Sequence, residues 1–398
     1  MINNIILSGG WGYGNIGDEA ILKYTYMDIK KVLPNCQITV LSYNPEETLY
    51  HHSINAEFSL HRILKELGNS EFDEYCRKIL NEDKNIPPKI KEYEDQLSEG
   101  TLFVMAGGGY FNDHWKESFL AHICEIKIAK NKGTKVAIIG QTIGPFSSKK
   151  NRDLISNILD QVDYIDVRDK TSYRLLKKIL PGKPIHLSCD AVVRNGEYKH
   201  QQSNNNIAVM FQRKRPFTNT KTTKFHYRAS QIVQLTTGQN AKFTKNMCEL
   251  VMKLHAEYPD SKIVFLESTK WHEDKIKKMV EQSHADGYFM GETVDDYIDE
   301  IAKTSCVIST NMHPTIFATT MGIPAIAISH TYKMDDYMKL IDQKRCIFYD
   351  IRVDEIFAEV KKIIQDEDNT QMLLSKNTEL CKKLDQTYLE LRYICEKY

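Results

Sequence analysis

One stretch of the chain decides the fold: Val307-Ile308-Ser309-Thr310-Asn311-Met312-His313-Pro314-Thr315-Ile316-Phe317-Ala318, continued by Gly322-Ile323-Pro324 and Ala325-Ile326-Ala327-Ile328. An apolar pair is followed by polar residues and a histidine, then by a segment rich in small residues, a Gly-Ile-Pro turn and a second apolar run. This order predicts a strand, a loop, a helix and another strand. In open α/β sheets, ligands bind at the carboxyl ends of strands, where such loops lie.

The histidine of this stretch is the first candidate for chemistry. His313 is expected at or near the N-terminus of the helix, and Pro314 fits the first helical position, where its missing N–H costs nothing. A helix N-terminus attracts phosphate and carboxylate groups, and a histidine can move a proton near neutral pH. The alternative is structural: a helix cap followed by a satisfied histidine.

Length and composition limit the class of protein. The 398 residues are enough for two domains, and the hydrophobic content of 41% and charged content of 27% are ordinary for a globular protein. Lys+Arg and Asp+Glu both number 53, so no overall field favours nucleic acid or an anionic membrane. Any positively charged site must therefore be local, and no nucleic-acid partner is expected.

Three sequence patterns bear on where in the cell the protein is expected: a signal peptide, a membrane span and paired cysteines. Its first residues do not resemble a signal peptide, and no apolar run approaches the roughly 20 residues of a membrane span. The 9 cysteines are scattered without a CxxC pair, which predicts neither a disulfide framework nor a zinc site. We expect a cytoplasmic protein without a metal site or an integral membrane segment.

The alternation of apolar and amphipathic runs predicts two doubly wound, Rossmann-like α/β domains that face a cleft. The first domain is expected over residues 1–198, with strands near residues 4–8, 37–41, 102–105, 135–139 and 164–167 and helices over about 18–33 and 116–130. The polar segment 51–97 reads as helical insertions on the outside. A polar linker near residues 195–206 leads to the second domain, 206–365, and the helical segment 366–398 would cross back to brace the first domain.

Three glycine-bearing loops follow predicted strands in the first domain. Gly12-x-Gly14-x-x-Gly17 matches the dinucleotide spacing only weakly, because no acidic ribose partner ends the next strand. Asp18 and Glu19 either favour the helix dipole or touch hydroxyls or a proton of a ligand. The other loops are Gly107-Gly108-Gly109 and Gly140-Gln141-Thr142-Ile143-Gly144. Three such loops at one edge of a sheet point to a ligand site.

Basic residues also follow strands. Arg168 either clamps an anion or pairs with Asp166 or Asp169. Arg213 and Arg215 follow the first strand of the second domain, where they are either solvated or hold an anionic ligand.

Taken together, the chain resembles the polysaccharide pyruvyl transferase family. The resemblance rests on segments that occur in family order: Gly14–Leu22, Gly107–Gly109, Gly140–Pro145, Val167-Arg168-Asp169 with Ser172, Cys189-Asp190-Ala191, and Met312-His313 with Ile316-Phe317-Ala318. It implies a fold like that of two-domain GT-B glycosyltransferases. It also implies transfer of a pyruvyl group from phosphoenolpyruvate, as co-substrate and without another cofactor, to hydroxyls of a sugar or lipid-linked glycan. Contact with a membrane would then come only peripherally, through the acceptor.

The resemblance also implies site residues. His313, Asp18 and Glu19 are expected to be catalytic, and the substrate-binding residues are expected to be Gly14, Asn15, Gly17, Gly108, Gly109, Gln141, Arg168, Arg213, Arg215, Asn311 and Lys333. The family usually has an arginine two residues before the histidine, where this chain has Asn311. That difference leaves two alternatives: a nucleotide-sugar-dependent glycosyltransferase on the same scaffold, or a scaffold that binds glycan without turnover.

Overall fold

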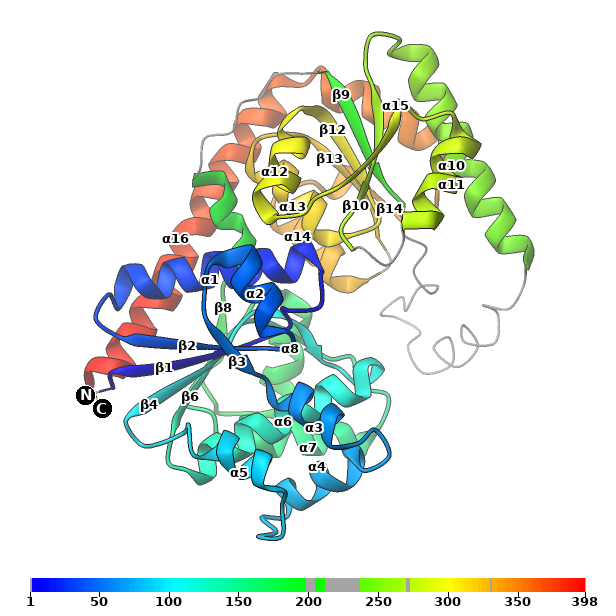
Figure 1. Cartoon of the computed structure of the whole chain (residues 1–398). Coiled ribbons are helices and arrows are strands. Elements are labelled where there is room, and N and C mark those ends of the chain that lie inside the picture. Colours follow the sequence, from blue (N-terminus) through cyan, green and yellow to red (C-terminus); the bar gives the residue numbers. More distant parts are fainter. Residues whose placement is uncertain (1, 198–204, 212–236, 270–272, 330, 398) are drawn as a thin grey trace. The chain divides into compact units, whose positions relative to one another are not determined.

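The computed structural model describes residues 2–197, 205–211, 237–269, 273–329 and 331–397, without the side chains of residues 237–241 and 275. The chain divides into two compact units (Figure 1). Unit 1 comprises Met1–Ala191 and Lys382–Tyr398, and unit 2 comprises Val192–Cys381. Each unit contains one parallel sheet with helices packed around it, so the predicted fold class of two doubly wound α/β sheets is confirmed.

The sheet of unit 1 has the order β3-β2-β1-β4-β6-β7-β8, with the short β5 paired to β6, and every pair is parallel. Its strands are β1 (Asn4–Ser8), β2 (Gln37–Ser42), β3 (Ala56–Phe58), β4 (Thr101–Met105), β5 (Gly108–Phe111), β6 (Lys135–Ile143), β7 (Tyr164–Val167) and β8 (His186–Leu187). Its helices are α1 (Ile16–Val32), α2 (Pro45–His52), α3 (Leu60–Leu67), α4 (Phe72–Leu80), α5 (Pro88–Glu94), α6 (Lys116–Asn131), α7 (Lys149–Leu159) and α8 (Lys170–Ile179), with a 3-10 turn η1 (Asp113–Trp115) before α6.

Three boundaries in unit 1 differ from the sequence prediction. Helix α1 begins at Ile16 rather than near Asp18, because the Asn15 side chain caps it by accepting from the Gly17 N–H at 3.0 Å. Strand β6 continues through residues 140–143, which were predicted to form a loop, and its register with β7 shifts between Ile138 and Gln141. Gly108 and Gly109 begin the short strand β5 instead of belonging to a loop.

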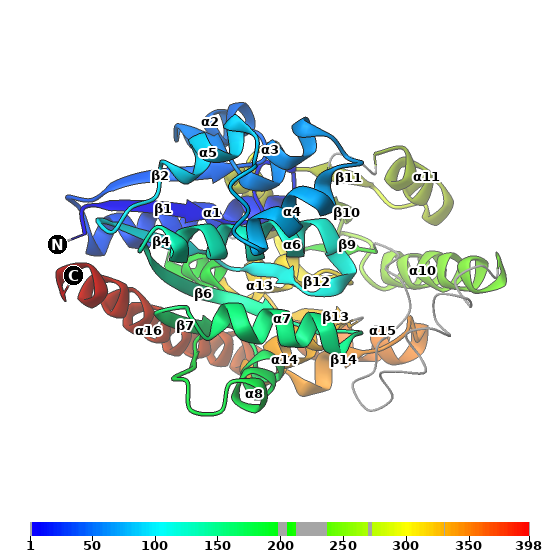
Figure 2. The ribbon, with the colours of Figure 1, turned by 90° about the horizontal axis from the view of Figure 1, so that it is seen from below.

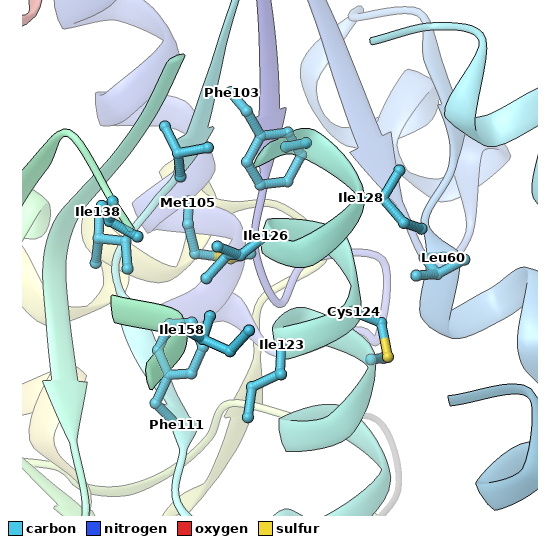
Figure 3. Close-up of a cluster of buried hydrophobic side chains, with 14 of the residues drawn as sticks. Leu60, Phe103, Met105, Phe111, Ile123, Cys124, Ile126, Ile128, Ile138 and Ile158 are labelled. Atoms are coloured by element: carbon cyan, nitrogen blue, oxygen red, sulfur yellow. The ribbon is translucent and has the colours of Figure 1, made fainter. Parts of the chain in front are cut away.

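The core of unit 1 lies between the sheet and α6. Figure 3 shows Phe103 and Met105 of β4 against Ile123 and Ile126 of α6, and all four are fully buried. The helices of segment 51–97 contribute their apolar faces to the same core, as does Leu60 at the start of α3. In Figure 2, α6 lies between α4 and α7, and it packs against both. The segment 51–97 is helical, as predicted, but its helices also contribute side chains to the core. It also contains the edge strand β3.

The sheet of unit 2 has the order β11-β10-β9-β12-β13-β14 and is also parallel throughout. Its strands are β9 (Asn206–Met210), β10 (Ile263–Glu267), β11 (Gly287–Met290), β12 (Thr304–Ser309), β13 (Ala325–Ile328) and β14 (Ile347–Phe348). Its helices are α10 (Thr237–Glu257), α11 (Glu273–Ser283), α12 (Val294–Ala302), α13 (Met312–Thr320), α14 (Tyr332–Leu340) and α15 (Val353–Ile364).

The final helix, α16 (Glu367–Lys397), contributes residues to both units. In its first part, the Asn369 Oδ1 accepts from Gln343 Nε2 at 2.6 Å within unit 2. In its last part, the Thr387 hydroxyl donates to Asp166 at 3.3 Å, and the Cys395 carbonyl accepts from the Ile2 N–H at 3.1 Å, both within unit 1. Within the described ranges, no helix is long and apolar enough to cross a membrane.

Candidate active site

One candidate region lies at the carboxyl edge of the sheet in unit 1. From β1 the chain adds β2 and β3 on one side, and then places β4 on the other side of β1. This reversal is the topological switch point, where open α/β sheets bind ligands. The two loops that flank it are residues 9–15, after β1, and residues 106–107, after β4. Both are glycine-bearing loops that the sequence singled out.

Tyr110 links the two elements that follow these loops, β5 and α1. Its hydroxyl donates to Asp18 Oδ1 at 3.0 Å, so a residue of β5 contacts the first turn of α1. Burial, together with the Asp18 carboxylate, raises the pKa of the Tyr110 phenol well above its ordinary value, which keeps it a neutral donor. A Cβ on Gly10 or on Gly108 would lie 2.1 Å from the Tyr110 ring, so both positions require glycine. Sequence reasoning missed Tyr110, although an aromatic residue directly after three glycines was a usable signal.

The two acidic residues of α1 have different surroundings. Glu19 is 2% exposed, and its Oε1 accepts from the Gly12 N–H at 2.8 Å. Its Oε2 lies 2.8 Å from Nε2 of His52. Asp18 is half-buried, with its Oδ1 held by Tyr110. Glu19 therefore holds the glycine loop in place, and the geometry favours Asp18 for contact with a ligand.

The rest of the first loop is also anchored. The Tyr13 ring stacks on Tyr43 with centroids 3.9 Å apart, and its hydroxyl lies 2.6 Å from Nδ1 of His61. Burial lowers the pKa of His61 to about 4, so its neutral ring can accept that bond. Asn15 serves as the cap of α1 and Gly17 is buried inside the first turn. Gly14 has free space beside its Cα, because a Cβ added there would meet no atom within 4 Å.

A buried polar network lies beneath this edge of the sheet. Arg168 is 6% exposed; its Nη1 donates to Asp190 at 2.5 Å and its Nε donates to the Thr142 hydroxyl at 2.9 Å. Thr142 in turn donates to Asp169 at 2.8 Å. The sequence left open whether Arg168 binds an anion or pairs with Asp166 or Asp169. In the structure its ion-pair partner is an internal carboxylate, that of Asp190.

Two further buried polar side chains lie in the neighbouring strands β6 and β7. Gln141, expected to bind substrate, is fully buried in β6; its Nε2 donates to the Ala106 carbonyl, and its Oε1 has no hydrogen-bond partner among the described residues. Asp166 accepts from the hydroxyls of Ser188 and Thr387 and, at 3.4 Å, from the Gly140 N–H. Burial raises the pKa of Asp166 to about 6.

A second candidate region lies at the switch point of the sheet in unit 2. From β9 the chain adds β10 and β11 on one side, and β12 then pairs with β9 on the other. The loop after β12 is held there because the N–H and hydroxyl of Thr310 both bond to the Met210 carbonyl, at 2.9 and 3.0 Å. His313 follows as the second residue of α13 and is half-buried. The predicted strand, loop, helix and strand are all present.

The N-terminus of α13 departs from expectation in one detail. Pro314 is the third helical residue rather than the first, which the first turn tolerates because its N–H would have no partner within the helix. Asn311 is the N-cap residue; Ser309 Oγ accepts from its N–H and donates to its carbonyl, both at 2.9 Å. Its side chain makes no capping bond, and its Oδ1 is buried without a hydrogen-bond partner within the described ranges.

Of the remaining predicted site residues, the structure describes Lys333 and Gly109. Lys333 is half-buried in the first turn of α14, after β13, which is the neighbour of β12. Gly109 lies in β5 beside Tyr110. Arg213 and Arg215 lie outside the described residues. Among the residues that are described, no group of three or more His, Cys, Asp or Glu side chains could hold a metal ion.

Comparison with known proteins identifies relatives in sequence. The profile of one family, Polysaccharide pyruvyl transferase, matches residues 15–332, which is most of the chain and includes Asp18, Tyr110 and His313. The amylovoran biosynthesis protein AmsJ of Erwinia amylovora is 21% identical over 382 residues, which cover 84% of this chain and 85% of AmsJ.

Comparison of structures identifies the fold. The UDP-GlcNAc 2-epimerase of Neisseria meningitidis, solved with UDP-GlcNAc bound, superposes with a TM-score of 0.58 at 11% identity, covering 96% of this chain and 99% of that one. The UDP-N-acetylglucosamine 2-epimerase of Rickettsia bellii has a TM-score of 0.58 at 14% identity, covering 98% and 96%. At this identity the likeness shows the fold alone, which is GT-B-like.

Proposed function

The chain belongs to the polysaccharide pyruvyl transferase family, and from this we propose that it transfers a pyruvyl group from phosphoenolpyruvate to hydroxyls of a sugar in a cell-surface polysaccharide or glycan precursor. One observation supports the proposal most: Gly14–Leu22 and Gly107–Gly109 follow the two strands at the switch point of unit 1, and Met312-His313 follow a strand at the switch point of unit 2. AmsJ, a relative over most of both chains, is named for the biosynthesis of amylovoran.

The reaction requires proton movement and the binding of negative charge. Protonation of the methylene carbon of phosphoenolpyruvate produces an oxocarbenium-like centre at the neighbouring carbon. One sugar hydroxyl adds to this centre and loses its proton, the carbon–oxygen bond to phosphate breaks, and a second hydroxyl closes the ketal. The enzyme must therefore supply an acid for the methylene carbon, a base for the hydroxyls, and donors for the carboxylate and phosphate.

We assign the proton on the donor side to His313. It is half-buried at the start of α13, at the carboxyl edge of a parallel sheet, and an imidazole exchanges a proton near neutral pH. The first turn of α13 contains no acidic residue, and its N–H groups and helix dipole suit a phosphate or carboxylate. His313 and the helix N-terminus would then serve the same anionic substrate.

We assign the acceptor hydroxyls to Asp18. Its carboxylate is half-buried at the switch point of unit 1, and the neutral Tyr110 phenol fixes its orientation through the 3.0 Å hydrogen bond. A carboxylate in this position can accept the proton that a sugar hydroxyl loses. Glu19 would support this role indirectly, by holding Gly12 and therefore the loop around Gly14.

The donor's remaining charges are assigned from sequence alone. Arg213 and Arg215 are our candidates, with Lys333 as a third. Asn311 stands where the family resemblance implies an arginine, so the amide and the first turn of α13 would take over part of that binding. A cytoplasmic location belongs to the same proposal: all nine cysteines are free thiols, and eight of them are buried.

Thermal unfolding with added ligands tests the proposal first. We expect phosphoenolpyruvate to raise the unfolding midpoint, since a ligand that binds only the folded state contributes about 2.7 kcal/mol at a hundredfold excess over its Kd. Phosphate release should then depend on an added sugar acceptor, and the product should carry a pyruvyl ketal by mass spectrometry and NMR.

The same experiment separates the alternatives. A shift with UDP-linked or GDP-linked sugars and none with phosphoenolpyruvate would contradict pyruvyl transfer and favour a glycosyltransferase. Tight binding of a glycan without any turnover would favour a scaffold that has lost catalysis.

A further inference from the structure

Unit 1 contains an open cavity of about 740 Å3 whose lining residues do not include any candidate site residue. It lies in the helix layer where α6 packs between α4 and α7 (Figure 2). The residues that line it come from the C-terminal half of α4, from α6, and from the length of α7. The side chains that line this cavity are partly cationic and partly apolar.

The rim of the cavity is strongly cationic. Arg77, Lys127, Lys149 and Lys150 line it together with a single carboxylate, Asp153, although the whole chain carries 53 positive and 53 negative residues. Lys127 pairs with Glu82. Within the described part of the chain, the other three cations have no ion-pair partner. This concentration of charge is local and favours an anion.

Two of these cations occupy a position that does not favour helix stability. Lys149 and Lys150 are the first two residues of α7, and the first turn has no acidic residue to offset them. Cations next to the positive end of a helix dipole are unfavourable, whereas an anion bound there would be favourable. The two lysines therefore do not stabilise α7 through its dipole, although Asp153 lies one turn further along the helix.

The floor of the cavity is apolar. Leu80 of α4 and Leu154 and Ile158 of α7 line it, and the two leucines are only half-buried. A free phosphate would satisfy the rim and leave these side chains in water. A ligand with an anionic head and an apolar body would cover both surfaces.

An exposed tryptophan lies at the same end of α7. Asp113 Oδ2 accepts from the Ser147 N–H at 2.7 Å and from Asn151 Nδ2 at 3.1 Å, which ties η1 to the first turn of α7. Trp115, two residues further in η1, is 60% exposed. Tryptophan side chains favour the interface between lipid and water, because one end of the ring is apolar and the other donates a hydrogen bond.

We propose that this face of unit 1, formed by the cavity between α4, α6 and α7 and by Trp115, binds anionic phospholipid at a membrane surface. The cationic rim would contact the phosphate head groups, and the apolar floor would cover the upper part of an acyl chain. The contact would be peripheral. The proposal does not depend on pyruvyl transfer, because it rests on residues outside the candidate active site.

Vesicle sedimentation tests it directly. Pure full-length protein is mixed with vesicles of phosphatidylcholine, or of phosphatidylcholine and phosphatidylglycerol in equal parts. We expect binding only to the anionic vesicles, weakening as salt is added. The triple variant Arg77→Gln, Lys149→Gln, Lys150→Gln should bind about a hundredfold more weakly, since each charge near an anionic surface contributes about fivefold.

A matched control removes three exposed charges elsewhere in unit 1: Lys91→Gln, Lys177→Gln, Lys178→Gln. It carries the same net charge as the triple variant and should bind like the wild type. Equal loss in both triple variants would mean general charge attraction and would overturn the proposal, as would binding to neither vesicle or equal binding to both. Displacement from vesicles by inorganic phosphate, beyond the effect of chloride at equal ionic strength, would point instead to a small-anion site. None of these readouts requires turnover.

Discussion

The carboxyl edges of the two sheets differ in what their polar side chains contact. In unit 1, Glu19, Arg168 and Asp190 are buried and bonded to other residues of the unit, so they hold the edge of the sheet in shape. In unit 2, His313 is half-buried at an uncharged helix start, and the buried Asn311 Oδ1 has no hydrogen-bond partner in the described ranges. Residues of one family motif set are therefore bonded within the unit in one sheet, whereas in the other sheet His313 is half-buried and we propose that it takes part in the chemistry.

This difference predicts that substitutions in the two regions fail in different ways. Breaking the network of unit 1 should lower the free energy of unfolding, because it leaves buried charges without partners. Changing the start of α13 should lower turnover or donor affinity while the protein stays folded.

The largest expected effect is on turnover. His313→Ala should reduce kcat about 10²- to 10⁴-fold, since it removes the proposed acid or base, and should leave the unfolding midpoint nearly unchanged. Phosphate release from phosphoenolpyruvate with the acceptor measures it. His284→Asn, at an exposed position of the same unit with φ of 55°, is the control and should keep full activity. Full turnover in His313→Ala would remove His313 from the mechanism.

Next comes the buried ion pair of unit 1. Arg168→Met should lower the free energy of unfolding by about 3–5 kcal/mol, because Asp190 would remain buried without its cation. Chemical denaturation of the purified variant gives the value. Arg174→Met, at an exposed position of α8, should change it by less than about 0.5 kcal/mol. If both variants unfold alike, Arg168 does not hold the edge of the sheet.

A third prediction uses pH. The pKa of Asp166 is raised from 3.8 to about 6 by burial, so its neutral form is favoured in the folded state. Its contribution to stability is therefore fully present below pH 3.8 and is lost as pH rises through about 6. Asp166→Asn has no such titration, so its stability relative to wild type should rise by about 2 kcal/mol between pH 4 and pH 7. A difference between the two proteins that stays constant over this range would contradict the raised pKa.

The smallest expected effect is that of Asn311→Asp, which should change the affinity for phosphoenolpyruvate more than the free energy of unfolding. Asn311→Asp introduces a negative charge at the N-cap of α13 with almost no change in shape. The helix dipole favours the new carboxylate and its burial opposes it, so the free energy of unfolding should change by less than about 1 kcal/mol, while phosphoenolpyruvate binding weakens about fivefold through repulsion. Thermal unfolding with and without the donor reports both. Tighter donor binding in this variant would mean that the anion lies elsewhere.

The sequence alone determined the class of fold and the loops that follow β1 and β12. Apolar runs alternating with amphipathic ones predicted parallel sheets, because β-α-β order permits few other arrangements. The stretch around His313 has the predicted strand, loop, helix and strand, since a helix start and a Gly-Ile-Pro turn are local signals. The resemblance carried by the glycine loops and His313 also identified the family correctly.

Only the tertiary structure decided which polar residues are partners. Glu19 bonds Gly12 and His52, Tyr110 bonds Asp18, and Arg168 bonds Asp190, and these pairs join residues 7 to 92 positions apart. Sequence reasoning considered Asp166 and Asp169 for Arg168 because they are near in the chain. Local backbone preferences depend on residues close together in the sequence, so they can be predicted from short stretches. The partner of a buried charge depends on which distant residues the tertiary packing brings within hydrogen-bond distance.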